Sequence, residues 1–268
     1  MPELTRTQVA DLIRLKEHAQ QLGADLVIIG AIAFQVYFPE VSRHTADIDF
    51  AVALNLNEFA EFEKQIKTDG WARTENREHR WRSASGTLLD LIPAGDQLRK
   101  AKEVVWPESK FAMSLVGFDH VFARSEPVRF ADDLELKVIP PVVLMLLKIV
   151  AFMDDQNRRA KDLLDIRSLM RRYETGSDRL FSDVVLEAKL EDFDLTNAFL
   201  VGLDLSSLCT DEEKRIVRQF IAALDEAKAA WMNFVRFGLG TGTEEAAQAQ
   251  LAAFKNGFEI GSKQPQKG

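Results

Sequence analysis

Apolar and polar positions follow two different periods along the first half of the chain. Apolar residues recur every three or four positions in three segments, which predicts helices over 5–22, 31–38 and 57–68. The apolar run 24–29 and the alternating segment 47–53 instead have the pattern of strands, and Pro39 ends the second helix. Helices and strands therefore alternate in this part of the chain.

More strands are predicted downstream. The segments 71–83 and 87–92 are expected to pair as antiparallel strands joined around Gly86, with Pro93 closing the second. Shorter strand-like pieces follow at 111–116, 120–123 and 134–138. We expect these segments to extend one sheet.

The second half has a helical period throughout. Six helices are predicted over 142–153, 158–173, 178–189, 195–205, 211–237 and 244–254. Pro140 and Pro141 mark the change, because a proline is accommodated in the first turn of a helix but not in its interior. We therefore expect two domains, 1–139 and 140–268.

Composition and charge narrow the class of protein. With 46% apolar and 28% charged residues, the 268-residue chain has the composition of a folded globular protein. A single cysteine, Cys209, excludes an internal disulfide, and no signal-peptide pattern opens the chain, so we expect a cytoplasmic protein. The longest nearly apolar stretch, 142–153, is too short to span a membrane. A net charge of −8 argues against broad non-specific binding of nucleic acid, although it leaves room for a local basic groove.

Two carboxylates stand together on the predicted strand 47–53. Side chains two positions apart project from the same face of a strand, so Asp47 and Asp49 are neighbours while Ile48 and Phe50 turn to the core. Adjacent carboxylates repel each other unless a cation lies between them, and Mg²⁺ (or Mn²⁺) is the oxygen-seeking ion that does so beside phosphates. The pattern predicts a metal site, and a polar strand end on a solvated face is the alternative.

A third carboxylate, Asp90, lies inside the apolar run 88–92, where an uncompensated charge is costly. On a strand next to the first pair, it would complete a three-carboxylate site, share the metal and accept a proton from an attacking hydroxyl. The alternative is an edge position, or an arginine partner such as Arg80 or Arg82.

Groups that could neutralise phosphate lie before and after these carboxylates. Gly30 ends a predicted strand where a helix begins, so the N–H groups of Gly30 and Ala31 are expected to face a triphosphate, unless the glycine is only a turn. Lys148 interrupts an apolar helix and must either reach water or meet an anion. Lys161 and Asp165 lie four apart on one helical face, where they can form a solvated ion pair or frame a ligand.

The segment 156–173 is strongly basic on this acidic chain. It holds six basic residues against two acidic ones, so it is a candidate surface for nucleotide phosphates or an RNA acceptor. The alternative is a helix that faces solvent.

Taken in order, the motifs resemble the polymerase-β-like nucleotidyltransferase superfamily. The resemblance depends on Ile-Ile-Gly-Ala at 28–31, Arg-His-Thr-Ala-Asp-Ile-Asp-Phe at 43–50, and Asp90 on a later strand. More narrowly, the form Arg-x-Thr-x-Asp-Ile-Asp, with Pro140–Pro141, Lys148 and the spaced Lys and Asp residues of 155–165, is similar to the AbiEii/AbiGii toxin branch. That branch consists of bacterial abortive-infection or toxin–antitoxin nucleotidyltransferases.

The resemblance implies an α+β fold: a nucleotidyltransferase domain with a mixed sheet, followed by an all-helical domain that completes the active-site cleft. It also implies site residues, with the metal on Asp47, Asp49 and Asp90, the nucleotide at Gly30, Ala31, Arg43 and Thr45, and a cleft lined by Lys148, Lys161 and Asp165. Gly30 is followed by alanine where the family usually has glycine or serine, which removes a flexible residue or a hydroxyl from the phosphate turn.

The activity implied is transfer of a nucleoside monophosphate from an NTP to an acceptor hydroxyl of tRNA, another RNA or a protein. A cognate antitoxin is the expected partner, and no membrane is involved. Two alternatives stay open at this point. One is a metal-dependent phosphodiesterase or nuclease that uses the same carboxylates with water as nucleophile, and the other is an inactive nucleotide-binding relative.

Overall fold

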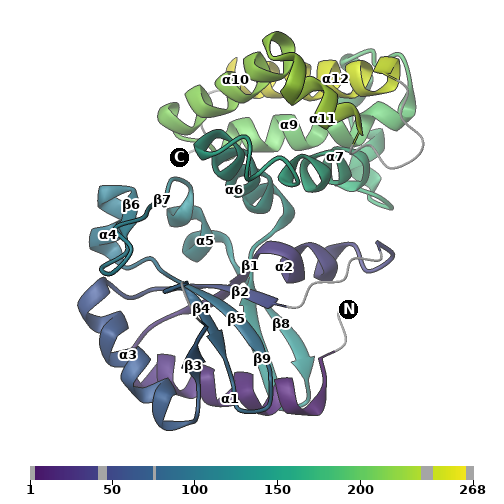
Figure 1. Ribbon diagram of the computed structural model, residues 1–268. Helices are drawn as coiled ribbons and strands as arrows, with labels where there is room; N and C mark the ends of the chain where they lie inside the picture. Colours follow the sequence, from purple (N-terminus) through teal and green to yellow (C-terminus); the bar gives the residue numbers. More distant parts are fainter. Residues whose placement is uncertain (1–3, 42–46, 75–76, 237–243, 264–268) are drawn as a thin grey trace. The chain divides into compact units, whose positions relative to one another are not determined.

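A computed structural model of the protein describes residues 4–41, 47–74, 77–236 and 244–263. The chain divides into two compact units, Met1–Pro140 and Pro141–Gly268, called here the N-terminal and C-terminal units (Figure 1). Within the described ranges, no helix is both long enough and apolar enough to cross a membrane.

The N-terminal unit contains a mixed sheet with helices. Its helices are α1 (Arg6–Gln21), α2 (Gly30–Tyr37), α3 (Leu56–Thr68), α4 (Asp96–Ala101) and α5 (Phe118–Arg124). Its strands are β1 (Leu26–Ile29), β2 (Asp47–Val52), β3 (Ala72–Arg73), β4 (Arg80–Arg82), β5 (Leu88–Pro93), β6 (Glu103–Val105), β7 (Ala112–Ser114), β8 (Glu126–Ala131) and β9 (Leu134–Val138).

Seven of these strands form one sheet in the order β3-β4-β5-β2-β1-β9-β8, and β6 pairs separately with β7. The central pair β2–β5 is parallel, as is β1–β9, while β1–β2, β4–β5 and β8–β9 are antiparallel. The sheet is therefore mixed, which confirms the predicted fold class for this part of the chain.

One face of the sheet is packed with large side chains. Ile48, Phe50, Leu89 and Trp81 are all buried there, and their polar neighbours in sequence point the other way. The helix α3 covers this face, since the ammonium of Lys67 lies 5.6 Å from the centre of the Trp81 ring. Burial of these apolar residues fixes the register of β2, β4 and β5, because a slip by one residue would exchange the two faces.

Two strand predictions for this unit are wrong. The piece 120–123 belongs to the helix α5, which begins after Gly117, a left-handed residue with φ of 86°. The segment 71–83 is not one strand, because β3 and β4 are two short strands that pair antiparallel with each other. No pattern in the sequence predicts α4, β6 or β8 as separate elements.

The C-terminal unit is helical, as predicted. Its elements are α6 (Pro141–Asp154), α7 (Asp162–Arg172), the 3₁₀ turn η1 (Asp178–Phe181), α8 (Asp183–Glu187), η2 (Phe193–Leu195), α9 (Thr196–Leu208), α10 (Asp211–Glu226), α11 (Lys228–Arg236) and α12 (Glu244–Lys263). Pro141 is the first residue of α6, where its missing N–H costs nothing. The single helix predicted over 211–237 is broken at Ala227, which has an extended backbone.

The helices α9 and α12 approach closely through glycines. A Cβ built on Gly257 would lie 1.9 Å from the carbonyl oxygen of Phe199, and one on Gly202 would lie 2.2 Å from that of Phe254. Side chains at these positions would separate the helices, so the packing depends on residues without a Cβ. Cys209, which caps the C-terminal end of α9, is fully buried.

Candidate functional site

The register of β2 and β5 aligns the three predicted carboxylates on one face of the sheet. The strands are parallel, with Asp49 opposite Asp90 and Asp47 opposite Leu88. Residues opposite each other in neighbouring strands project from the same face, as do residues two apart in one strand. Asp47, Asp49 and Asp90 therefore share the face that points away from Trp81 and α3.

Gly30 lies directly against Asp49. The antiparallel pairing of β1 and β2 puts Ile29 opposite Asp49, and the chain then turns into α2 through Gly30, whose φ is +69°. A Cβ on Gly30 would lie 2.1 Å from Asp49 Oδ2. The glycine is needed both for its left-handed backbone and for this close approach. Ala31, the next residue of the predicted phosphate turn, is buried.

Arg80 connects two of the carboxylates. Its Nε lies 2.7 Å from Asp90 Oδ1 and its Nη2 lies 2.7 Å from Asp90 Oδ2, and the same Nη2 donates to Asp47 Oδ2. This two-pronged geometry is the strong form of a carboxylate–guanidinium contact. The hydrogen bonds to Asp90 raise the pKa of Arg80, although burial acts against this. The arginine partner considered for Asp90 from the sequence is therefore present.

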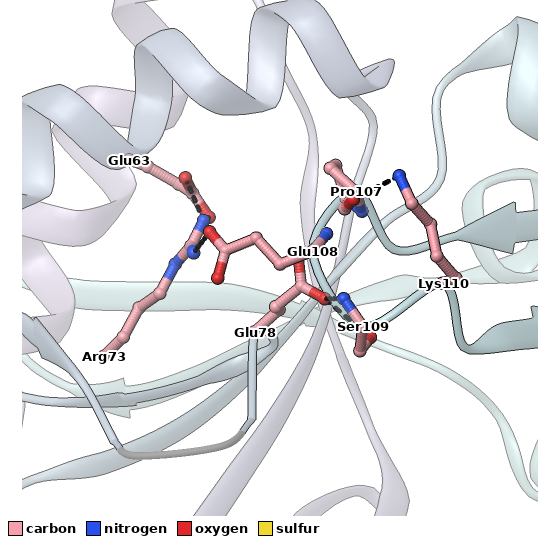
Figure 2. A network of polar contacts seen from close by, with 7 residues as sticks. All are labelled: Glu63, Arg73, Glu78, Pro107, Glu108, Ser109 and Lys110. Atoms are coloured by element: carbon pink, nitrogen blue, oxygen red, sulfur yellow. Dashed lines mark hydrogen bonds and ion pairs between the residues drawn. The ribbon is translucent and has the colours of Figure 1, made fainter.

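A buried carboxylate two residues away anchors the segment that leads into Arg80. Glu78 accepts hydrogen bonds from the backbone N–H of Glu108 at 2.9 Å, and from the N–H and hydroxyl of Ser109 at 2.8 and 2.6 Å (Figure 2). Burial raises the pKa of Glu78, but the Ser109 and Glu108 hydrogen bonds outweigh it, so the net pKa is lowered. Beside it, Arg73 joins Glu63 to Glu108. The loop between β6 and β7 is thus tied to the start of β4.

The nucleotide-contacting residues predicted at Arg43 and Thr45 lie outside the described residues, as does His44. Their assignment stays a prediction.

In the C-terminal unit, Lys148 meets two buried carboxylates. Its Nζ lies 2.8 Å from Asp162 Oδ1 and 2.9 Å from Asp165 Oδ2, and both aspartates are at most 2% exposed. Arg159 makes a further ion pair of 2.6 Å with Asp162. The two aspartates of α7 therefore provide the negative charge that Lys148 needs in its apolar helix. Lys161, the residue before α7, is exposed.

Two features of this cluster were not assigned from the sequence. Asp162 received no role, although its spacing of three from Asp165 places both on one face of a helix, opposite a lysine in need of an anion. The basic segment 156–173 was considered as one surface, but Arg167 is only 3% exposed. It donates to the carbonyl oxygens of Phe234 and Val235 at the end of α11. Arg167 therefore caps a helix rather than joining a basic surface.

Comparison with known proteins identifies the class. Residues 14–253 match the family described as nucleotidyl transferase AbiEii toxin, type IV TA system. Together with the mixed sheet and helical second unit, this makes the protein a nucleotidyltransferase. More narrowly, the chain belongs to the AbiEii toxin family, as its motifs predicted. No curated protein matches the sequence significantly.

Several solved structures are similar at low identity. ANT(2″)-Ia in complex with adenylyl-2″-tobramycin is 15% identical with a TM-score of 0.39, over 60% of this chain and 86% of that one. An antigenic nucleotidyltransferase-like protein from Paracoccidioides brasiliensis is 12% identical with a TM-score of 0.38, over 87% and 95%. The CCA-adding enzyme with ATP is 11% identical with a TM-score of 0.33, over 96% and 82%.

Nucleotidyltransferases of this kind generally use an NTP and divalent metal ions, and the chemistry of the carboxylate face fits such an ion. Asp47, Asp49 and Asp90 offer hard oxygen donors of the type that Mg²⁺ prefers. Asp49 occupies space that only a glycine at position 30 leaves open. Within the described ranges, however, no three Asp, Glu, His or Cys side chains converge closely enough to hold an ion as they stand. The guanidinium of Arg80 already bonds two of the three aspartates.

Proposed function

We propose that this nucleotidyltransferase moves a nucleoside monophosphate from an NTP to an acceptor hydroxyl, with pyrophosphate leaving, in a reaction that depends on Mg²⁺ or Mn²⁺. The observation that supports the proposal best is the β2–β5 register, which puts Asp49 opposite Asp90 with Asp47 on the same face. Carboxylates from two strands beside a glycine turn are suited to hold an ion next to phosphates.

The three aspartates would hold the ion, and when bound it would offset charge on the triphosphate and align the α-phosphate. Asp90 would also accept the proton of the attacking hydroxyl. The N–H groups of Gly30 and Ala31 would face the triphosphate, since a close approach of backbone to ligand is what a glycine at a helix start permits. Positioning and charge account for most of such catalysis.

Further roles are proposed from family membership. Arg43 and Thr45 would contact the nucleotide, and Lys148 and Lys161 would offset charge on the triphosphate. Asp165 would position Lys148, with which it forms an ion pair.

We also propose RNA, tRNA included, as the acceptor, and a toxin role with a cognate antitoxin as partner. Membership of a family described as toxins of a type IV toxin–antitoxin system supports the toxin role. Protein is the second acceptor class to test. A cytoplasmic location would follow from an RNA acceptor and from the single cysteine.

The test is incubation of the purified chain with each α-labelled NTP, Mg²⁺ and total RNA or lysate, followed by identification of the labelled species. Asp49→Asn should lower transfer on the order of a hundredfold or more, because the amide binds a cation poorly. Asp132→Asn, at an exposed position in the turn between β8 and β9, removes the same charge and should leave transfer unchanged.

Three results would contradict the proposal. Full activity of Asp49→Asn would show that Asp49 is not needed to bind the metal ion. Shortened RNA in place of labelled RNA would indicate a phosphodiesterase or nuclease. Tight NTP binding with no product from any acceptor would indicate an inactive nucleotide-binding relative.

A further inference from the structure

Arg80 occupies the oxygens that a metal ion at this face would need. It bonds both carboxylate oxygens of Asp90 and Oδ2 of Asp47. Asp90 is only 8% exposed, so its charge depends on a nearby cation. Asp49 adds to the negative potential at the guanidinium. One arginine side chain therefore serves as a cation for the carboxylate face.

Contacts of the residues before and after Arg80 fix the backbone there, and this sets the position from which the guanidinium extends. Trp81, the next residue, is fully buried on the opposite face, and β4 pairs with β5 so that Arg80 lies opposite Asp90. On the other side, Glu78 is bonded to the β6–β7 loop (Figure 2). The backbone carbonyl of His79 also accepts a hydrogen bond from the N–H of Leu91 at 2.8 Å. Contacts other than those of the guanidinium therefore fix the backbone at Arg80.

A divalent ion and a guanidinium compete for the same carboxylate oxygens, because the two positive charges repel each other when both lie against one carboxylate. In the metal-free protein, the planar guanidinium of arginine can bond two carboxylates at once. Its positive charge offsets the repulsion between the carboxylates on β2 and β5. An ion that binds Asp47 and Asp90 therefore weakens this contact or displaces part of it. The free energy of the Arg80 contacts that are lost on ion binding therefore lowers the affinity of the site for the ion.

We propose that Arg80 is a positioning residue that holds Asp47 and Asp90 together in the metal-free protein and yields them to the divalent ion, so that it sets the metal affinity of the site. This inference rests on the proposed function. If Arg80 only stabilised the structure of the site, its removal would lower the affinity for the metal ion. If Arg80 competes with the ion, its removal raises that affinity.

The test measures Mn²⁺ binding by calorimetry and melting temperature in EDTA and in Mn²⁺, on the full chain. Arg80→Gln should bind Mn²⁺ about tenfold more tightly than wild type, since one set of charged hydrogen bonds no longer has to be broken. In EDTA it should melt at a lower temperature than wild type, because the aspartates repel each other. Mn²⁺ should raise its melting temperature more than that of wild type.

Arg82→Gln is the matched control. Arg82 lies two residues along β4, on the same face and exposed, so its removal changes the net charge equally. Its effect on Mn²⁺ affinity should be small. Arg80→Lys keeps the charge without the planar fork, and its Mn²⁺ affinity should lie between wild type and Arg80→Gln. This variant gives the answer if the glutamine variant does not fold.

Asp49→Asn separates failure of the inference from failure of the proposed function. If it binds Mn²⁺ as wild type does, Asp49 does not hold the ion, so the proposed three-carboxylate site is wrong and the role of Arg80 that rests on it falls too. If Asp49→Asn loses binding but the Arg80 variants bind no more tightly than wild type, the metal site stands and the inference is wrong. An equal gain in Arg82→Gln would also overturn it.

Discussion

The substitution Gly30→Ala adds one methyl group next to Asp49 and so tests whether the site needs the observed position of this carboxylate. Gly30 has a left-handed backbone, and a Cβ at this position would lie 2.1 Å from Asp49 Oδ2 and 2.8 Å from its Cγ. The variant therefore changes two things at once. It strains the backbone at the start of α2, and it pushes on a carboxylate assigned to the metal.

The two effects differ in size and in what they change. A left-handed alanine costs about 1–2 kcal/mol of stability relative to glycine. The contact requires Asp49 Oδ2 to retreat by about 1 Å to reach the 3.0 Å below which real Cβ contacts are essentially never found. A displacement of about 1 Å at a reacting group can lower a rate about a hundredfold. We therefore expect a modest loss of stability and a large loss of transfer.

Gly23→Ala is the control that separates these effects. Gly23 has φ of +65°, close to the value at Gly30, but a Cβ there would meet nothing within 4 Å. Both variants should lose a similar amount of stability in urea unfolding, while only Gly30→Ala should lose NMP transfer at temperatures where it is fully folded. If Gly30→Ala transfers as well as Gly23→Ala, Asp49 does not need its observed position and the site assignment is wrong.

Two further predictions concern stability. Gly257→Ala should lower the unfolding free energy by about 1–3 kcal/mol in urea, because its Cβ would overlap the carbonyl oxygen of Phe199, whereas the exposed neighbour Asn256→Ala should have little effect. Glu78→Gln should cost about 1–2 kcal/mol at neutral pH through weakened hydrogen bonds from Ser109. Because the folded pKa of Glu78 is lowered, its contribution is present above the ordinary value of 4.5 and is lost as the pH falls through the lower folded value. Melting curves of wild type and variant should therefore converge in acid, and a constant difference would contradict this origin.

Local periodicity was sufficient for the strands that carry the carboxylates. In β2, the alternation of Asp47, Ile48, Asp49 and Phe50 defines a polar and a buried face, and the structure has both. Asp90 was notable because a charge within an apolar run requires compensation. These inferences need only the period of a strand and the cost of burying charge.

Contacts between distant segments could not be inferred in the same way. Arg80 and Arg82 were equal candidates for Asp90, and the choice depends on the β4–β5 register, which pairs Arg80 with Asp90 and Arg82 with Leu88. The helix α5 was missed because three consecutive apolar residues at 121–123 are too few to distinguish a strand from a helix. Likewise, the apolar period runs from α10 into α11 without a break, although the backbone turns at Ala227.

The burial of Cys209 has a practical consequence for studies of the folded protein. This residue is the single thiol of the chain, and it belongs to the C-terminal unit. Burial raises its pKa, which suppresses the reactive thiolate in the native state. The rate at which a thiol reagent labels the native protein therefore measures opening around α9. Local unfolding of the C-terminal unit can be timed in this way without an engineered label and without a contribution from residues 1–140.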